Sequence, residues 1–272
     1  MPELPEVETV VQNLKSKILG QKIIGVGVLC TKIFDLVPAC VIGEIILDIT
    51  RRGKYIIIKL NTGYLVIHLR MTGKFFAVSK PVPEINQAKL LTNYAKHLHV
   101  IIELQDYFLL FQDQRKFGKI NFYENLDWLE NKLGPEPLLA DFTQSYLATI
   151  FKSNKQVKAL LLDQSKIAGL GNIYVDELLW QAGVHPATLA SKISPAKTNL
   201  IYLAIREILQ KAISLQGTTF LSYAFDGDKP GNYLNHLKVF NRTNQSCLRC
   251  GGVITKIKIA QRGTHVCEFC QR

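Results

Sequence analysis

The sequence predicts a multidomain protein of the α+β class, because three parts of the chain follow three different patterns. Residues 22–124 contain short runs rich in β-branched and aromatic residues, whereas helical periodicity dominates residues 155–214. Residues 238–272 contain two Cys-x-x-Cys pairs. A chain of 272 residues is long for one simple domain and favours two domains with a small appendage. We expect domains at 1–130, 138–237 and 238–272, with 131–137 as a linker.

Residues 5–20 predict an amphipathic helix that opens the first domain. Pro5 suits its first turn, Gly20 suits its end, and one face carries Val7, Val10, Val11, Leu14 and Ile18. Strand-like runs follow at 22–29, 54–60, 64–70, 97–104 and 107–113, and a hairpin-sized turn at 61–63 joins the second run to the third. Strands at this spacing predict a sandwich or a barrel.

The linker is marked by Gly134-Pro135-Glu136-Pro137, which interrupts the strand pattern. Helices are then expected at 155–163, 172–182 and 197–214, and the last of these has a stripe made of Ile201, Ile205, Ile208, Leu209 and Ala212. The polar, glycine-rich segment 217–235 predicts a long loop, which is where binding residues often lie.

The charge balance indicates an anionic partner. The chain has 33 Lys and Arg against 22 Asp and Glu, a net charge of +11, and residues 238–272 carry a large share of this excess. Such a balance favours nucleic acid over a membrane surface. No apolar run approaches the roughly 18 residues of a membrane span, and no basic-then-apolar leader is present, so we expect a cytoplasmic protein.

The four C-terminal cysteines predict a metal site. Cys247-x-x-Cys250 and Cys267-x-x-Cys270 are spaced as in zinc ribbons, and four thiolates leave no open coordination position, so one structural Zn²⁺ is expected. A hairpin around Gln261-Arg262-Gly263 would connect the two pairs. The alternatives are two disulfides or four free thiols. A reducing cytosol disfavours the disulfides. Cys30 and Cys40 are expected to be core residues.

Several motifs, in order along the chain, resemble those of one family. They are Pro2-Glu3-Leu4-Pro5-Glu6, Arg51-Arg52-Gly53-Lys54-Tyr55, His68-Leu69-Arg70-Met71, Asp113-Gln114-Arg115-Lys116-Phe117-Gly118, Gly169-Leu170-Gly171-Asn172 and the cysteine pairs with Gln261-Arg262-Gly263. Together they span nearly the whole chain. The sequence resembles the formamidopyrimidine-DNA glycosylases.

The resemblance implies both a fold and an activity. The fold is an N-terminal β-sandwich with a leading helix, then a helical domain with a helix-two-turn-helix, then a zinc ribbon. The activity is that of a bacterial DNA glycosylase and abasic-site lyase, which removes 8-oxoguanine and formamidopyrimidines and nicks the strand by β,δ-elimination. The expected partner is damaged double-stranded DNA. Neither a membrane nor an obligate protein partner is expected, and the protein is expected to be a monomer that associates with the nucleoid.

The resemblance also implies catalytic roles. Pro2, exposed by removal of Met1, supplies a secondary amine as the nucleophile, and an α-amine is neutral to a larger extent at pH 7 than lysine is. Glu3 protonates the sugar, Lys54 donates a proton during β-elimination, and Arg262 acts in δ-elimination and phosphate binding. The residues alone allow other interpretations. Pro2 could simply precede a helix, Glu3 and Glu6 could be acids that suit a helix N-terminus, and Lys54 could lie on a solvated basic edge.

DNA contacts are implied in the same way. Met71, Arg115 and Phe117 match residues that fill the space left by an extruded base. The alternative for Met71 and Phe117 is core packing, but a Met at the end of a strand and a Phe just before a Gly favour exposure. His97, Arg115 and Asn172 match phosphate contacts, with Asn172 opening a helix whose N-terminus can face a phosphate. Among Lys152, Lys155 and Lys158, one is expected to bind the backbone, and we assign Lys155. Glu6, Thr218 and Thr219 are expected to recognise the lesion.

Two departures and three alternative functions accompany the resemblance. Phe240-Asn241 stands where the family usually has Tyr-Gly, and Lys158-Ala159 where it tends to have Lys-Pro, which affects DNA affinity and not the chemistry. The sister class that removes oxidised pyrimidines typically has glycine at the position of Leu4 and lacks the His-Leu-Arg-Met run. A silent lesion-binding protein would require a change at Pro2, Glu3 or Lys54, and a zinc-ribbon transcription factor would leave the N-terminus unexplained.

Overall fold

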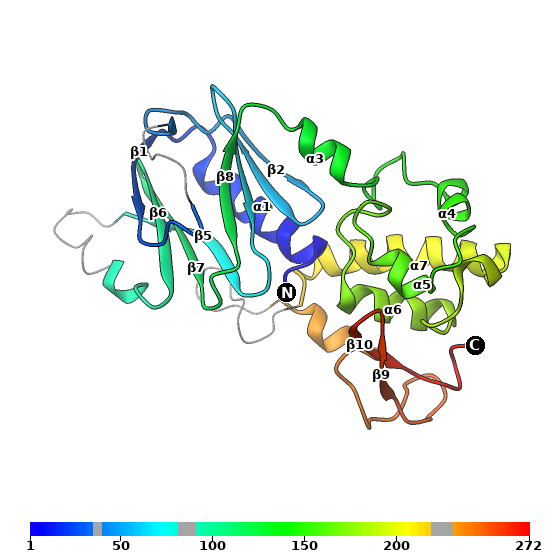
Figure 1. Ribbon diagram of the computed structural model, residues 1–272. Helices are drawn as coiled ribbons and strands as arrows, with labels where there is room; N and C mark the ends of the chain where they lie inside the picture. Colours follow the sequence, from blue (N-terminus) through cyan, green and yellow to red (C-terminus); the bar gives the residue numbers. More distant parts are fainter. Residues whose placement is uncertain (35–39, 81–90, 219–230) are drawn as a thin grey trace. The chain divides into compact units, whose positions relative to one another are not determined.

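The computed structural model describes residues 1–34, 40–80, 91–218 and 231–272. Two compact units make up the chain (Figure 1). The first includes Met1, Pro2 and Glu6–Trp128, and the second includes Glu3–Pro5, Leu129–Thr218 and Asn232–Arg272. The helical part and the cysteine-rich tail therefore share one unit, while the three-domain division expected from the sequence stays a proposal.

Two antiparallel sheets form the first unit (Figure 1). One has the order β1-β6-β7-β5, with bounds Ile23–Val28, Leu98–Leu104, Tyr107–Asp113 and Gly73–Ser79. The other has the order β2-β3-β4-β8, with bounds Asp48–Arg52, Tyr55–Lys59, Tyr64–His68 and Lys119–Tyr123. Apolar side chains from both sheets share one core, so the β-sandwich prediction is confirmed.

The leading helix α1 (Leu4–Ile18) is confirmed together with its predicted apolar face. Val7, Val10, Val11, Leu14 and Ile18 are each at most 5% exposed and belong to the core of the sandwich. Gly20 follows the helix with a φ of +81°, a left-handed conformation that favours glycine, which explains why the helix ends there.

Helices dominate the second unit. They are α3 (Asp127–Lys132, which begins in the first unit), α4 (Gln144–Ile150), α5 (Val157–Leu161), α6 (Asn172–Ala182) and α7 (Pro195–Ser214), with short 3₁₀ turns η3 (Ala190–Lys192) and η4 (Tyr233–His236). The predicted stripe of α7 is buried, and Ser194 caps this helix by accepting a hydrogen bond from the Lys197 amide. α6 is buried on nearly all sides, so other elements of this unit pack around it.

The tail forms the hairpin β9 (Thr255–Ile259) and β10 (Arg262–Val266). Ala260 and Gln261 make the turn, with φ angles of +48° and +59°, as a two-residue hairpin loop of type I′ requires. The prediction placed the turn at Gln261-Arg262-Gly263 and was wrong by one residue, because Ala and Gln are not typical of this turn. Arg262 is instead the first residue of a strand. No helix of the described residues is long and apolar enough to cross a membrane.

Candidate active site and nucleic-acid interface

Met71, Arg115 and Phe117 form a surface cluster in the first unit. The Arg115 Nη1 atom lies 3.0 Å from the Met71 Sδ atom, across 44 residues of sequence. The guanidinium carbon of Arg115 lies 4.7 Å from the centre of the Phe117 ring. Met71 is 41% and Phe117 is 45% exposed, so neither is a core residue. The structure therefore brings together three side chains that the sequence selected from two separate motifs.

Asp113, which the sequence analysis did not select, holds this cluster in place. It is 1% exposed, and one carboxylate oxygen accepts hydrogen bonds from the amides of Phe117 (2.8 Å) and Gly118 (2.7 Å). The other oxygen accepts from the Arg115 amide (3.1 Å) and from the hydroxyl of Thr72, the residue after Met71. One buried carboxylate thus joins the two loops.

His97 lies next to the same loops. The Asp113 amide donates to the His97 carbonyl over 2.9 Å, and the His97 side chain is exposed. His97, Arg70 and Lys116 have φ angles between +55° and +60°, which is uncommon for residues other than glycine. Such strained backbone is often found where side chains are held for binding.

Lys54 lies in the turn between β2 and β3. The register pairs Tyr55 with His68, so Lys54 lies beside the end of β4, from which the chain continues to Met71. Lys54 is 6% exposed and has partners, which does not fit a solvated basic edge. An ion pair of 2.8 Å between Arg51 and Glu8 ties the same hairpin to α1.

The N-terminal segment is buried. Pro2 is buried next to the exposed Met1, and Glu6 is 2% exposed. In the second unit, the Glu3 carboxylate accepts hydrogen bonds from the amides of Ile173 (2.9 Å) and Tyr174 (3.4 Å). These amides belong to the first turn of α6, at the positive end of that helix. Because both donate to Glu3, these two amides do not bind a phosphate.

The two glycines before α6 make room for the N-terminal segment. A Cβ at Gly171 would lie 2.2 Å from the Cδ of Glu3, and a Cβ at Gly169 would lie 2.7 Å from a Leu4 methyl carbon. Gly169 also has a φ of +87°, and its carbonyl accepts a hydrogen bond from the Leu4 amide over 3.1 Å. The glycine motif is therefore required by close packing against residues 3 and 4.

The three candidate lysines have different surroundings. Lys155 has a side chain that is 63% exposed, at 3.8 Å from an Asp163 oxygen, and Lys152 is exposed. Lys158 is fully buried, and its Nζ lies 2.5 Å from a carboxylate oxygen of Asp176. Burial lowers the pKa of Lys158, whereas the Asp176 and Glu3 carboxylates oppose that shift. Lys155 stays the predicted phosphate contact, and Lys158 is committed to the protein interior.

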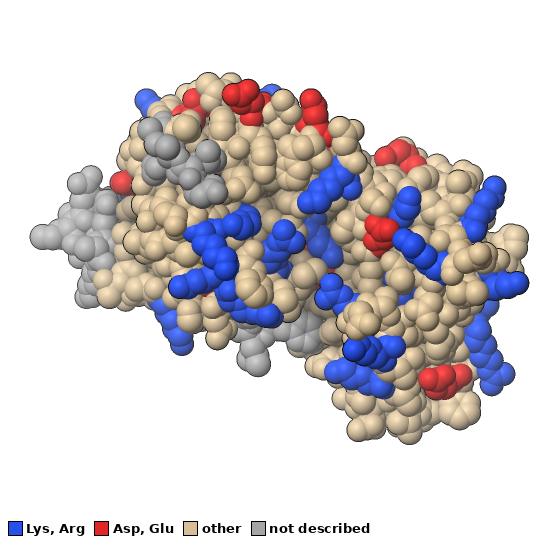
Figure 2. Space-filling model, in the orientation of Figure 1, with Lys and Arg blue, Asp and Glu red and all other residues tan. Residues whose placement is uncertain are grey.

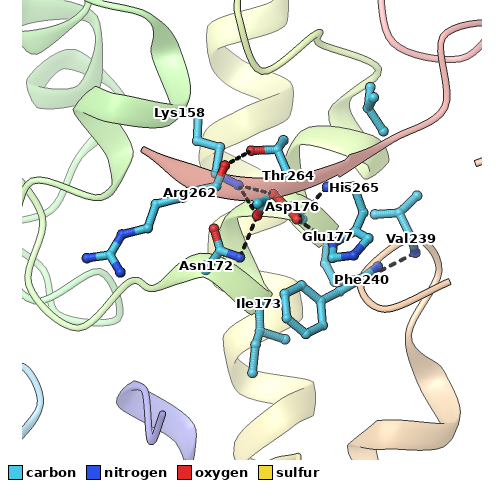
Figure 3. A network of polar contacts seen from close by, with 12 residues as sticks. Lys158, Asn172, Ile173, Asp176, Glu177, Val239, Phe240, Arg262, Thr264 and His265 are labelled. Atoms are coloured by element: carbon cyan, nitrogen blue, oxygen red, sulfur yellow. Dashed lines mark hydrogen bonds and ion pairs between the residues drawn. The ribbon is translucent and has the colours of Figure 1, made fainter. Parts of the chain in front are cut away.

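Arg262 and Asn172 meet at the start of β10. Asn172 donates from Nδ2 to the Gly263 carbonyl over 2.9 Å, and Arg262 is exposed, with its guanidinium extending away from the hairpin (Figure 3).

Thr218 is 3% exposed and forms a β-bridge with Asn232, so its side chain is not presented at the surface. Thr219 lies outside the described residues, and its role stays a prediction.

The four C-terminal cysteines converge on one point. Their Sγ atoms all lie within 4.8 Å of one another. Burial would raise the pKa of Cys247, but hydrogen bonds from the Arg249 and Cys250 amides and the Trp180 indole lower it to about 6. Burial and the other thiols raise the pKa of Cys270 to about 12. The thiols thus compete for negative charge, and a bound divalent cation would remove this conflict.

Comparisons with known proteins cover the whole chain. Residues 1–120 match the formamidopyrimidine-DNA glycosylase N-terminal domain, residues 133–223 match the H2TH domain of the same enzymes, and residues 244–272 match a zinc finger found in FPG and IleRS. The formamidopyrimidine-DNA glycosylase of Protochlamydia amoebophila is 41% identical, and that of Lactococcus lactis is 40% identical, each over 100% of both chains. The chain belongs to the formamidopyrimidine-DNA glycosylase family.

Solved structures agree with this assignment. A complex between a Lactococcus lactis FPG mutant and DNA containing Fapy-dG has a TM-score of 0.88 at 38% identity, over 100% of both chains. A complex of MutM with DNA containing carbocyclic 8-oxo-G has a TM-score of 0.86 at 39% identity, again over 100% of both chains. The helix-two-turn-helix and zinc-ribbon predictions are thereby confirmed.

The cysteine cluster is the structural zinc site of this family. The match to the zinc-finger model and the four converging thiols confirm the prediction of one Zn²⁺ held by Cys247, Cys250, Cys267 and Cys270. Trp180 of α6 donates to the Cys247 Sγ atom over 3.4 Å, and the Arg249 guanidinium lies 4.1 Å from the centre of the same indole. The site is therefore anchored to α6 by side chains around the ligands.

The surface charge fits a nucleic-acid partner. On the face drawn in Figure 2, Lys and Arg side chains are prominent on each unit, and Asp and Glu side chains are sparse. The buried acids Asp113, Asp176 and Glu177 organise the loops and the hairpin, and none of them was predicted from the sequence as a functional residue. A signal was present for two of them, since adjacent acids in a buried apolar helix require partners.

Proposed function

We propose that the chain removes oxidised purines, 8-oxoguanine and formamidopyrimidines, from duplex DNA and then nicks the strand. The observation that carries this proposal is the exposed cluster of Met71, Arg115 and Phe117. The choice of lesion is supported by related proteins whose structures were solved in complex with DNA that contains Fapy-dG or carbocyclic 8-oxo-G.

The cluster suits an enzyme that extrudes a base from the helix. A base inside a duplex is out of reach, and extruding it costs a few kcal/mol. Met71 occupies the vacated position in the stack, Arg115 binds the orphaned partner base, and Phe117 wedges the neighbouring step. The stiff backbone around Asp113 holds these side chains ready before DNA arrives, which reduces the loss of entropy on binding.

Pro2 is the nucleophile in this proposal. After removal of Met1, its secondary amine attacks C1′ of the damaged nucleotide, the bond from C1′ to the base breaks, and the base leaves with a proton. Protonation of O4′ lets the C1′–O4′ bond break, so the sugar ring opens and an iminium forms between C1′ and the proline nitrogen. The iminium withdraws electrons and acidifies the adjacent C2′, so loss of a C2′ proton expels the 3′ phosphate, and a second elimination expels the 5′ phosphate.

Other residues position and transfer protons. The helix α6 amides orient the Glu3 carboxylate, which is the acid that protonates the sugar. Lys54 supplies a proton during β-elimination, and Arg262 acts in δ-elimination and binds phosphate. His97, Lys155 and Asn172 bind the DNA backbone. Glu6 and Thr219 contribute to lesion recognition, and the buried Thr218 contributes by holding the backbone through its β-bridge to Asn232. The zinc takes no part in the chemistry, because four thiolates close its coordination sphere.

The experiment compares lesions in otherwise identical duplexes. With purified protein in excess, single-turnover excision of 8-oxoguanine paired with cytosine is measured against excision of thymine glycol paired with adenine. We expect a clear preference for 8-oxoguanine. A preference for thymine glycol would assign the chain to the oxidised-pyrimidine class, and binding to both duplexes without any excision would make it a lesion-binding protein.

A further inference from the structure

Two adjacent acids lie inside α6. Asp176 is 1% and Glu177 is 2% exposed, in a helix whose other side chains are largely apolar. A buried carboxylate is tolerated when hydrogen bonds or charges compensate its lost hydration. The partners of these two acids therefore show what α6 holds in place.

Asp176 holds β10 at its fourth residue, His265 (Figure 3). One oxygen accepts a hydrogen bond from the His265 amide over 2.9 Å and lies 3.1 Å from its Nδ1 atom. The other oxygen lies 2.5 Å from the Nζ of Lys158, which reaches it from α5 and is fully buried. Asp176 is thus the shared partner of β10 and α5.

The Gly263 carbonyl is held by neighbours of Asp176. The Asn172 Nδ2 donates to it over 2.9 Å, and the Lys158 Nζ lies 3.5 Å away. The hydroxyl of Thr264, a fully buried residue, donates to the Arg262 carbonyl over 3.1 Å. Residues 262–265 are therefore fixed by polar contacts at nearly every position, and the Arg262 side chain points away from them (Figure 3).

The hairpin needs such support at this end. Arg262 directly follows Ala260 and Gln261, two residues in a left-handed conformation that is unfavourable for side chains other than glycine. Within the second unit, Arg262 also acts through space on Lys158 and lowers its pKa further. The arginine and the buried pair thus lie within electrostatic reach of each other.

We propose that Asp176 is a positioning residue for Arg262: it holds the His265 amide, three residues along β10, and the Lys158 ammonium beside the Gly263 carbonyl, and so fixes the place of the guanidinium. The inference rests on the proposed function, in which Arg262 binds phosphate and acts in δ-elimination. Asp176 is 1% exposed, so the proposal gives it a positioning role and no contact with DNA or the reacting sugar.

Glu177 provides a matched control. It is adjacent to Asp176 in the same helix turn and equally buried, but it accepts hydrogen bonds from the amides of Lys238, Val239 and Phe240, and these residues precede the hairpin. Glu177→Gln keeps the shape of this buried side chain and removes none of the polar contacts of residues 262–265; it reaches His265 only indirectly, because the Phe240 ring lies 4.9 Å from the His265 ring.

The test uses the full chain with zinc bound and a duplex that contains one abasic site. The variants are Asp176→Asn, Glu177→Gln, Arg262→Ala and the double variant Asp176→Asn with Arg262→Ala. Zinc content and thermal midpoint are measured first. The readouts are the rates of β- and δ-elimination, separated by the gel mobility of their products, and the dependence of DNA affinity on salt.

We expect Asp176→Asn to keep zinc, to lower the ratio of δ- to β-elimination roughly tenfold and to reduce the salt slope by about one phosphate contact. Glu177→Gln should leave both unchanged. In the Arg262→Ala background, Asp176→Asn should add less than about a twofold change to either readout, because the two residues act as one unit.

Several results would overturn the inference. One is an unchanged elimination ratio and salt slope in a folded Asp176→Asn protein, and another is an equal effect of Asp176→Asn with and without Arg262. If Asp176→Asn loses zinc, the neutral pair Lys158→Met with Asp176→Leu decides, since it leaves no buried charge unpaired. Zinc loss or a normal ratio in that variant contradicts a positioning role. A wild-type protein that gives no product at all contradicts the proposed function instead.

Discussion

The Glu3 carboxyl group lies where a side chain at position 171 would be, so only glycine fits at that position. The first turn of α6 supplies two amide donors to Glu3, and the missing side chain at Gly171 lets the carboxylate reach them. The sequence identified Glu3 through its place beside Pro2, but the glycine appeared only as part of a turn. Its requirement is set by a contact between residues 168 positions apart, which no local pattern contains.

Gly171→Ala should therefore impair catalysis without unfolding the protein. The new methyl group would lie 2.2 Å from the Glu3 Cδ and displace the carboxylate. A misplacement of about 1 Å can cost about 10²-fold in rate, and we expect that loss in single-turnover excision of 8-oxoguanine. Gly27→Ala is the control, because a Cβ there meets its neighbour at an ordinary 3.8 Å. Equal rates for the two variants would contradict the role assigned to Glu3.

Lys54→Ala should slow 8-oxoguanine processing by a factor on the order of 10²–10⁴, the usual share of general acid–base catalysis. Lys59→Ala, at the exposed end of the following strand β3, is the matched control and should retain the wild-type rate. The measurement is single-turnover strand cleavage, with thermal midpoints to check folding. A wild-type rate for Lys54→Ala would remove this residue from the catalytic set.

Met71→Ala should weaken binding to a lesion-containing duplex by about tenfold or more, since burying a side chain of this size is worth about 1.5–3 kcal/mol. Single strands leave no hole to fill, so binding to them should change little. Leu19→Ala, at a comparably exposed apolar residue, controls for general surface effects. Equal losses on both forms of DNA, measured by fluorescence anisotropy, would argue against the proposed role of Met71.

At the scale of elements, prediction from sequence succeeded where the pattern was regular. The bounds of β7 and α6 agree with the predicted 107–113 and 172–182, because one is a continuous apolar run and the other a helix between glycines. The strands β2, β5 and β8 were not predicted. β2 reads Asp-Ile-Thr-Arg-Arg and buries only Ile49, so its strand character comes from pairing with β3 and not from its own composition.

The zinc ribbon should have two separable roles: the metal stabilises its fold, and Arg262 contacts the DNA. Cys250→Ser should lose zinc and abolish DNA binding, while the sandwich keeps its own core and its β-type circular dichroism. Arg262→Ala should keep zinc but weaken binding and reduce the slope of log affinity against log salt by about 0.9, the share of one phosphate. Metal content and salt titrations measure both effects. Intact lesion binding after complete chelation would contradict the scaffold role.

At the scale of the whole molecule, each unit carries some of the residues to which the proposed function gives a role. The resemblance assigned residues from each, including Lys54 and Met71 in the first and Glu3 and Arg262 in the second. It did not reveal Asp113 or Asp176, since these side chains touch other protein groups and their importance depends on packing. A resemblance transfers residues that match a motif, whereas buried partners become visible only when the chain is folded.

The central claim is that the N-terminal secondary amine of Pro2 forms a covalent intermediate with damaged DNA. The most direct measurement is borohydride trapping on a duplex with one 8-oxoguanine, followed by proteolysis and mass spectrometry of the peptide that carries the DNA adduct. We expect an adduct on the N-terminal peptide that begins at Pro2, with Met1 removed. An adduct on the Lys54 peptide of the unmodified protein, or no adduct while excision proceeds, would contradict it.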